Sequence, residues 1–269
     1  MRHRLYGQSI IWSQDFDTDL LAELFKRADV HATKKKSKKK PLEDKRIAML
    51  FYEESTRTRW SFETAAQYLG ATCLSTENAR QFSSVAKGET LEDTIRVTAR
   101  YAHAIVLRHF EDDAAIRARD ILQSQGIWVP IINAGCGKGQ HPTQSLMDLY
   151  TIWKEVGRMD NLTVVMVGDL RHGRTVRSLA YLLGKFPGNR IHFISPRELA
   201  IGVDILAYLR RHKIEFTEGT DLGAVIGAAD VVYMTRVQKE RFEDPAAFER
   251  LRHSYRLTVA LAEQMQPHA

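Results

Sequence analysis

A Ser-Thr-Arg-Thr-Arg segment, Ser55 to Arg59, follows an apolar run and is the clearest candidate for chemistry in this chain of 269 residues. A strand that leads into Ser-Thr at the start of a helix presents free backbone N–H groups, hydroxyls and the positive helix end to an anion. Arg57 adds a charge that pairs with phosphate oxygens, and Arg59 either joins it or forms a structural ion pair. The segment predicts a phosphate site, against the plainer alternative of an ordinary Ser/Thr cap with Glu63 nearby.

Two further strand candidates also lead into cationic or polarising residues. One ends in Arg108 and His109, and another runs through a glycine-containing loop to His141 and Pro142. Proline suits the first position of a helix. Beside arginines, His141 is suited to donate a hydrogen bond to a carbonyl oxygen that gains charge during attack. We expect these strand ends to belong to one sheet, because open α/β sheets bind ligands at the carboxyl ends of their strands.

The second half of the chain has arginines after its own apolar runs. One run leads into Arg171 and Arg174, and another leads into Arg236, Lys239 and Arg241. Two arginines that face a cleft suit a ligand with two carboxylates. For Arg171, Lys239 and Arg241 we prefer the interpretation of solvated surface charge.

The elements that position these residues are predicted from the pattern of apolar residues. Short apolar runs, which indicate strands, alternate with longer segments of helical periodicity, which indicate helices. Strands are expected at residues 46–53, 71–76, 102–109, 127–135, 162–168, 190–195, 213–219 and 230–235. Helices are expected at residues 17–28, 55–70, 90–102, 112–126, 142–159, 174–186, 203–212 and 221–229. Residues 81–90 read as a polar loop with a capping pattern.

Buried strands that alternate with helices predict parallel sheets, and eight strands are enough to close one barrel. The long helical pattern at 142–159, however, divides the chain into two halves of four strands each. The sequence therefore predicts an α/β protein with two open parallel-sheet domains joined by a helix.

Charge and composition limit the class of protein. Lys and Arg number 39 against 33 Asp and Glu, yet six of the lysines lie within residues 34–40, and without them the two totals are equal at 33. One short run on a balanced chain predicts a solvated loop rather than a nucleic-acid partner. No stretch reaches the roughly 18 apolar residues of a membrane span, and the N-terminus lacks the apolar core of a signal peptide. We expect no membrane partner and a cytoplasmic location.

With these residues in view, the sequence resembles the catalytic chains of the aspartate carbamoyltransferase family, within the aspartate/ornithine carbamoyltransferase superfamily. Five segments carry the resemblance in order: Ser55 to Arg59 with Ser61-Phe62-Glu63; Lys87-Gly88-Glu89-Thr90; His141-Pro142-Thr143-Gln144; Gly168-Asp169-Leu170 through Gly173-Arg174-Thr175; and Met234-Thr235-Arg236-Val237-Gln238. The resemblance implies transfer of a carbamoyl group from carbamoyl phosphate to the amino group of L-aspartate, in pyrimidine biosynthesis, with no metal or organic cofactor.

The resemblance also implies roles for individual residues. Carbamoyl phosphate is expected to be held by Ser55, Thr56, Arg57, Thr58, Ser83, Lys87, Arg108, His141 and Gln144. Aspartate is expected to contact Lys87, Arg174, Arg236 and Gln238. The catalytic set is Arg57, Thr58, Lys87, Arg108, His141 and Gln144: His141 and Thr58 polarise the carbonyl, Gln144 holds the amide nitrogen, and Arg57 stabilises the departing phosphate.

Domain limits and assembly follow from the same resemblance. It assigns residues 1–142 to a carbamoyl phosphate-binding domain, 143–156 to an interdomain helix, and 157–269 to an aspartate-binding domain. In the family a serine and a lysine reach in from the neighbouring subunit, and these positions match Ser83 and Lys87. A homotrimer with shared active sites is expected, with the presence of regulatory or other pathway subunits left open.

The rival within the superfamily is ornithine carbamoyltransferase, which has Ser-Met-Gly where this chain has Met234-Thr235-Arg236. Arg236 and Arg174 favour a second carboxylate and would repel cationic ornithine.

Two departures from the family pattern stand out. Cys136 follows Asn-Ala-Gly where the family more often has an acidic residue; we interpret it as a tolerated substitution, with a reactive thiol as the alternative. Cys136 and Cys73 lie too far apart in the sequence to indicate a metal knuckle or a disulfide framework. The family also continues beyond the point that matches residues 264–269, with a His-Pro-Leu-Pro substrate loop and helices that return to the first domain. A non-catalytic carbamoyltransferase-like subunit, or a truncated inactive chain, is therefore the alternative function.

Overall fold

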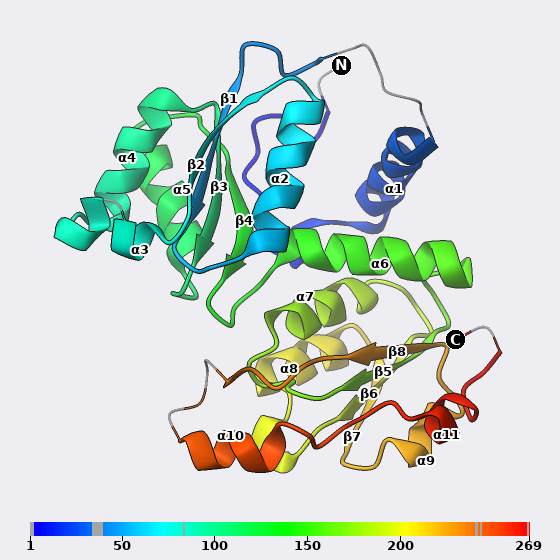
Figure 1. The fold of residues 1–269 in the computed structure, drawn as a ribbon. Coiled ribbons are helices and arrows are strands. Elements are labelled where there is room, and N and C mark those ends of the chain that lie inside the picture. Colours follow the sequence, from blue (N-terminus) through cyan, green and yellow to red (C-terminus); the bar gives the residue numbers. More distant parts are fainter. Residues whose placement is uncertain (1–2, 34–39, 83, 240–241, 243, 268) are drawn as a thin grey trace. The chain divides into compact units, whose positions relative to one another are not determined.

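The computed structural model describes residues 3–33, 40–82, 84–239, 242, 244–267 and 269 (Figure 1). Most of the lysine run and Ser83 lie outside the described residues. The chain divides into two compact units, one made of residues 1–15 and 23–143 and the other of residues 16–22 and 144–269. The domain limits expected from the resemblance stay a prediction, and each unit is described by itself below.

Unit 1 is built on a parallel four-stranded sheet in the order β2-β1-β3-β4. Its strands are β1 (Arg46–Phe51), β2 (Thr72–Thr76), β3 (Ala104–His109) and β4 (Ile131–Cys136). The four strands expected in the first half are thus confirmed. The last of them begins later than expected, because Pro130 has no N–H group to donate to a neighbouring strand.

Helices cover both faces of this sheet, with α2 on one side and α4 and α5 on the other (Figure 1). The helical segments up to the last strand of this sheet are η1 (Ser13–Asp15), α1 (Thr18–Thr33), α2 (Thr56–Tyr68), α3 (Ala79–Phe82), η2 (Ser84–Lys87), α4 (Leu91–Tyr101) and α5 (Ala114–Ser124). The expectation of a loop at residues 81–90 is wrong in part, because this segment contains the end of α3 and all of η2. Its capping pattern is confirmed, since the Thr90 hydroxyl accepts a hydrogen bond from the Asp93 N–H at 3.1 Å.

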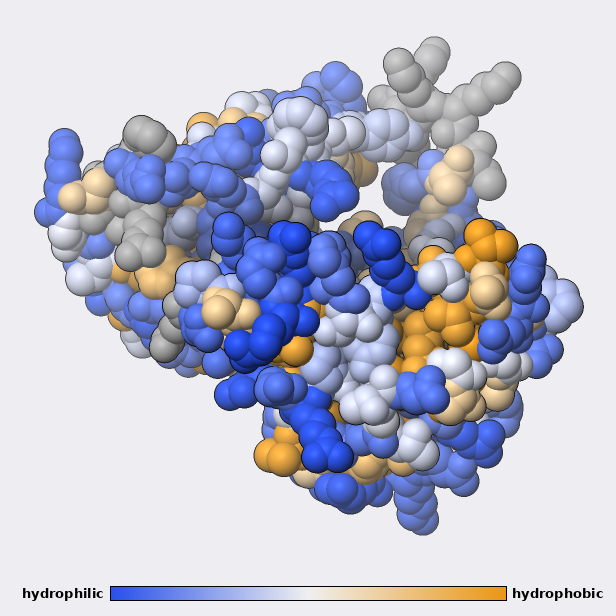
Figure 2. All heavy atoms as spheres, turned by 60° about the horizontal axis from the view of Figure 1, so that its bottom comes forward, coloured by the Kyte–Doolittle hydropathy of each residue, from blue (hydrophilic) through white to orange (hydrophobic). Residues whose placement is uncertain are grey.

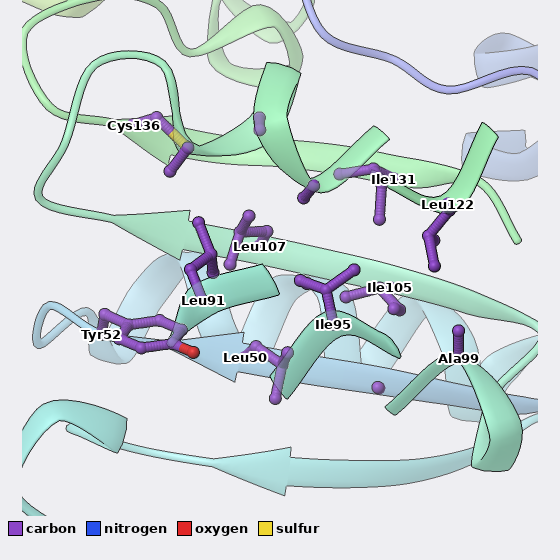
Figure 3. Packing of buried hydrophobic residues seen from close by; sticks show 14 of the residues in the cluster. Leu50, Tyr52, Leu91, Ile95, Ala99, Ile105, Leu107, Leu122, Ile131 and Cys136 are labelled. Atoms are coloured by element: carbon purple, nitrogen blue, oxygen red, sulfur yellow. The ribbon is translucent and has the colours of Figure 1, made fainter. Parts of the chain in front are cut away.

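The alternation of side chains along β1 explains why both faces need a cover. Leu50 belongs to the cluster under α4 and α5, together with Ile95 and Ile105, whereas Met49 and Phe51 belong to the cluster under α2. Figure 3 shows the first cluster, with side chains of the strands and of the helices above them packed together. Each fully buried side chain of this kind contributes roughly 1.5–3 kcal/mol relative to an exposed one, so the helices are held to the sheet mainly by apolar contact.

Unit 2 contains the second parallel sheet, in the order β7-β6-β5-β8. Its strands are β5 (Thr163–Val167), β6 (Arg190–Ile194), β7 (Glu215–Gly219) and β8 (Val231–Met234). The helical segments from α6 on are α6 (Pro142–Val156), α7 (Arg174–Leu183), η3 (Arg197–Leu199), α8 (Val203–Arg211), α9 (Gly223–Ile226), α10 (Pro245–Leu251) and α11 (Val259–Ala262). The expected fold class, two open parallel α/β sheets with flanking helices, is confirmed.

Two short helices near the end of the chain, α10 and α11, were not expected from the sequence. They are too short to produce a helical period of apolar residues, and they are defined by their caps instead. Asp244 accepts hydrogen bonds from the N–H groups of Ala246 and Ala247, and Thr258 accepts one from Leu261. Capping residues stabilise the start of a helix even where the spacing of apolar residues does not indicate one.

No described helix is both long and apolar enough to cross a membrane. Figure 2 shows one face of the molecule, on which hydrophilic side chains predominate and an apolar area interrupts them at the right.

A buried histidine at the end of β3 ties stability to pH. His109 is 2% exposed, its ring lies 4.5 Å from that of Tyr52 and 4.2 Å from that of Phe110, and its Nδ1 accepts a hydrogen bond from the Glu111 N–H at 3.0 Å. Burial lowers the pKa of His109; the nearby Glu111 carboxylate opposes this shift without reversing it. The folded protein therefore holds this imidazole neutral.

We expect the free energy of unfolding to fall as the pH drops below about 6.5, because the unfolded chain takes up a proton there that folded His109 does not. One such proton corresponds to a slope of about 1.4 kcal/mol per pH unit, down to the lower pKa of the folded state. Urea unfolding at several pH values between 7.5 and 5 measures the slope. It should become shallower in His109→Gln and stay as in the parent in His253→Gln, which changes an exposed histidine. Parallel slopes in all three chains would contradict this account.

Candidate active site

Three strands of unit 1 bring their carboxyl ends to one edge of the sheet. β1 pairs with β3 and β3 pairs with β4, all parallel. The Tyr52 N–H donates to the Arg108 carbonyl at 2.8 Å, and the Gly137 N–H donates to the His109 carbonyl at 2.9 Å. The expectation that the Ser55 segment, Arg108 and the loop toward His141 follow neighbouring strands of one sheet is confirmed.

The start of α2 has the features of an anion site. Ser55 occupies the N-cap position, yet its side chain makes no capping hydrogen bond. The alternative of an ordinary Ser/Thr cap is thereby ruled out for Ser55. Thr56 and Arg57 are exposed, and Arg57 makes no hydrogen bond or ion pair with the residues that the structure describes. Backbone N–H groups, hydroxyls and one guanidinium therefore gather at the positive end of a 13-residue helix.

Of the two roles left open for Arg59, phosphate binding or a structural ion pair, the structure supports the ion pair. Its Nη2 lies 2.9 Å from Glu77 Oε2, and its Nε lies 4.0 Å from Glu63 Oε1. An arginine held between two carboxylates is largely neutralised. The charge available to an anion at this helix start is thus that of Arg57.

Arg108 and His141 are held more tightly than Arg57. The Arg108 side chain is 13% exposed, its Nη2 lies 3.5 Å from Glu53 Oε2, and its Nη1 donates to the Ala134 carbonyl at 3.4 Å. His141 is 5% exposed and directly precedes Pro142, which begins α6 as expected. The Nδ1 of His141 lies 3.4 Å from the Thr143 hydroxyl. Both side chains are fixed before a ligand arrives, which favours precise alignment.

The expected contribution of a neighbouring subunit stays a prediction. Lys87 ends η2 and is exposed, and Gly88 after it has a φ of 96°. Ser83 lies outside the described residues. The roles assigned to Ser83 and Lys87 rest on the resemblance alone.

In unit 2, two loops that follow the paired strands β5 and β8 pack closely together. Gly168 has a φ of 112°, and a Cβ atom there would lie 2.3 Å from the Thr235 carbonyl oxygen. The Gln238 side chain donates from Nε2 to the His172 carbonyl at 3.1 Å. Only glycine permits this approach. Arg174 is the first residue of α7, directly after the loop that follows β5, and this loop packs against the one that carries Arg236 and Gln238.

Several residues that organise these loops were not given a role from the sequence. Asp169 is completely buried and accepts a hydrogen bond from the His172 N–H at 3.0 Å, while the His172 ring Nδ1 lies 3.1 Å from the same oxygen. Asp148 accepts from Gln144 and from Tyr233, both at 2.8 Å. The i,i+4 spacing of Gln144 and Asp148 was the available sequence signal.

Cysteine and metal chemistry receive no support within the described part of the chain. Cys136 is completely buried in the core cluster of unit 1, which fits the interpretation of a tolerated apolar substitution. No group of three or more His, Cys, Asp or Glu side chains among the described residues is arranged to hold a metal ion.

Comparison with known proteins gives the family. The model for the carbamoyl-P binding domain of aspartate/ornithine carbamoyltransferases matches residues 8–154, and the model for their Asp/Orn binding domain matches residues 160–269. The chain belongs to the aspartate/ornithine carbamoyltransferase family.

Individual relatives agree with this family. The chain is 48% identical over 263 residues to aspartate carbamoyltransferase 3, chloroplastic, of Pisum sativum, covering 97% of this chain and 66% of that protein. It thus spans about two thirds of the length of this relative. Among solved structures, the catalytic subunit of Methanocaldococcus jannaschii aspartate transcarbamoylase is similar with a TM-score of 0.81 at 44% identity, covering 95% of this chain and 82% of that chain.

The aspartate transcarbamoylase of Trypanosoma cruzi, solved in complex with carbamoyl phosphate and aspartate, is similar with a TM-score of 0.87. Its identity to this chain is 31%, and the match covers 97% of this chain and 83% of that one.

The close approach of Thr235 to Gly168 predicts that alanine lowers the free energy of unfolding more at this glycine than at a glycine with open space around it. Gly168→Ala should destabilise the chain by about 3 kcal/mol or more, because a Cβ atom adds a backbone clash to the cost of a positive φ. Gly157→Ala is the matched control: its φ is 81°, but a Cβ atom there meets nothing within 4 Å. It should cost only about 1 kcal/mol. Urea unfolding followed by circular dichroism compares the two, and equal losses would show that the Thr235 contact is unimportant.

Proposed function

We propose that this chain transfers the carbamoyl group of carbamoyl phosphate to the amino group of L-aspartate, giving N-carbamoyl-L-aspartate and phosphate. The observation that carries the proposal is the uncapped start of α2 with Arg57, beside the strand end that holds Arg108. Supporting it, relatives at 44–48% identity bear the name aspartate carbamoyltransferase. The T. cruzi relative was solved with carbamoyl phosphate and aspartate bound.

The residues of unit 1 suit the phosphate and the carbonyl of the donor substrate. Hydroxyls and N–H groups at Ser55, Thr56 and Thr58 hold the phosphate, and Arg57 stabilises the charge that grows on it as it leaves. His141 and Thr58 donate to the carbonyl oxygen of the carbamoyl group, and Arg108 adds positive charge. The amine nitrogen forms a bond to the carbonyl carbon, the bond from that carbon to the phosphate oxygen breaks, and the proton that the amine loses passes to the departing phosphate. Alignment and charge stabilisation supply most of the catalysis for such a step.

The residues of unit 2 suit the acceptor. Aspartate carries two carboxylates. Arg174 begins the helix after the β5 loop, Arg236 lies on the neighbouring loop after β8, and the Gln238 side chain of that second loop contacts the first at His172. Arginine binds carboxylates in a bidentate geometry. The same two charges disfavour ornithine, whose side chain is cationic.

The proposal includes an assembly and a location. Ser83 and Lys87 act in the site of a neighbouring subunit, so the working form is a homotrimer with shared sites, and no metal or organic cofactor takes part. The location is the cytoplasm, as expected from the sequence, although the pea relative is chloroplastic by name.

The direct test is formation of carbamoyl-aspartate by the purified chain, measured by a colorimetric assay. We expect Arg57→Ala to lose about 100- to 1,000-fold in kcat, because removal of one charge-stabilising donor typically costs this much. Arg100→Ala, which changes an exposed arginine of α4, should retain parental activity. A folded parent chain without turnover would favour the non-catalytic subunit, and equal turnover in parent and Arg57→Ala would remove the phosphate site from the mechanism.

Shared sites predict complementation between two inactive chains. Arg57→Ala and Lys87→Ala are each expected to be inactive as homotrimers. After mixing in equal amounts and subunit exchange, about a quarter of the sites should combine an intact Arg57 with an intact Lys87 from the next chain in the ring. The assay should then recover about a quarter of parental activity. No recovery, with mixed trimers demonstrated by native mass spectrometry, would place both residues in the same chain's site.

A further inference from the structure

A half-buried carboxylate in unit 2, that of Asp148, links a candidate substrate residue to a strand of the sheet. Asp148 lies on α6, one turn after Gln144, and Tyr233 comes from β8. The Gln144 Nε2 donates to Asp148 Oδ1 at 2.8 Å, and the Tyr233 hydroxyl donates to Asp148 Oδ2 at 2.8 Å. Each carboxylate oxygen thus has its own donor, and the helix is tied to the strand through Asp148.

The hydrogen bond to Asp148 determines which end of the Gln144 amide is engaged within the protein and which end can contact a ligand. A side-chain amide has a donor end and an acceptor end, whereas an ionised carboxylate only accepts. Asp148 therefore takes the NH₂ end of Gln144 and leaves the carbonyl oxygen Oε1 to accept a hydrogen bond. Rotation of the amide by half a turn would place Oε1 against Asp148 Oδ1, which is unfavourable for two acceptors in a partly buried position.

Tyr233 holds the carboxylate in its turn. Burial raises the pKa of the Tyr233 hydroxyl, and the neighbouring Asp148 raises it further, so the hydroxyl keeps its proton and remains a donor. Burial also raises the pKa of Asp148, while the hydrogen bonds from Gln144 and Tyr233 oppose that shift.

We infer that Asp148 and Tyr233 are positioning residues that hold Gln144 with its carbonyl oxygen presented to the NH₂ group of the carbamoyl substrate. The inference rests on the proposed function, in which Gln144 contacts that amide nitrogen. It adds a basis for selectivity: an acceptor held in one orientation favours an amide and disfavours a carboxylate of the same shape. Binding of the phosphate group does not depend on the orientation of the Gln144 amide.

Two isosteric probes separate this selectivity from phosphate binding. Phosphonoacetamide carries the amide and phosphonoacetate carries a carboxylate in its place, and both are measured by titration calorimetry with the parent chain. We expect the parent to bind phosphonoacetamide about tenfold more tightly than phosphonoacetate, as sites built for one hydrogen-bonding group reject its analogue. Asp148→Asn offers its own NH₂ group to Gln144, so the Gln144 amide turns and the ratio should fall to about one or reverse. Affinity for inorganic phosphate should stay as in the parent.

Double substitution shows whether Asp148 acts through Gln144. Gln144→Ala alone should abolish the preference, and adding Asp148→Asn to it should change the ratio no further. Tyr233→Phe keeps the Gln144 contact but loses the second donor, so it should reduce the ratio by about threefold. This variant also decides the matter if Asp148→Asn does not fold: a parental ratio in folded Tyr233→Phe would then overturn the inference.

The binding measurements also distinguish failure of the positioning role from failure of the proposed function. A parental ratio in folded Asp148→Asn overturns the positioning role alone. The positioning role is also overturned if the parent chain binds inorganic phosphate but has the same affinity for phosphonoacetamide and phosphonoacetate. A folded parent that binds neither probe nor phosphate removes the proposed function, and the inference falls with it.

Discussion

Parallel strands end at the same edge of a sheet, and this constraint gathers the candidate site residues of each unit. In unit 1, β1 and β3 deliver the Ser55 segment and Arg108 to neighbouring positions, although more than 40 residues separate them in the chain. In unit 2, β5 and β8 do the same for Arg174 and Arg236. Antiparallel pairing would send half of these residues to the opposite edge. The apolar contacts that cover both faces of each sheet matter to function because they preserve this arrangement.

The positive charge that matters for an anionic substrate is not the charge that dominates the composition. The surplus of six is equal to the lysines of residues 34–40, whereas Arg57 and Arg108 belong to the balanced remainder. Within that remainder the structure separates two kinds of arginine. Arg59 is held between Glu63 and Glu77, while Arg57 has no such partner among the residues described. Local pairing, rather than net charge, determines which cations a ligand can use.

Much of the fold was predictable because it depends on local patterns. Runs of buried apolar residues gave both four-stranded sheets, and the Pro142 start of α6 followed from the fixed φ of proline. The phosphate-like helix start at Ser55 was also visible, but its uncapped state was not, since a cap is decided by one side-chain rotamer. Short helices such as α10 escaped because they depend on Asp244 rather than on an apolar period.

The contacts between distant residues were out of reach of the sequence. Asp148 and Tyr233 are 85 residues apart, and only the fold of unit 2 brings α6 and β8 close enough for their hydrogen bond. The same holds for Gly168, whose need to be glycine arises from the carbonyl of Thr235. A glycine after a strand suggests a turn, but the atom that forbids a side chain there belongs to another loop.

Charge and orientation make separate contributions to recognition in this arrangement. An arginine attracts any phosphate, and it attracts a carboxylate more strongly than a neutral amide, so it cannot by itself select the amide of the carbamoyl group. A glutamine can make this distinction, but only if its amide cannot turn, since either end of a free amide adapts to either ligand. The half-buried Asp148, held by Tyr233, removes that freedom from Gln144. A carboxylate that never touches the substrate would thereby convert a nonselective phosphate site into one for carbamoyl phosphate.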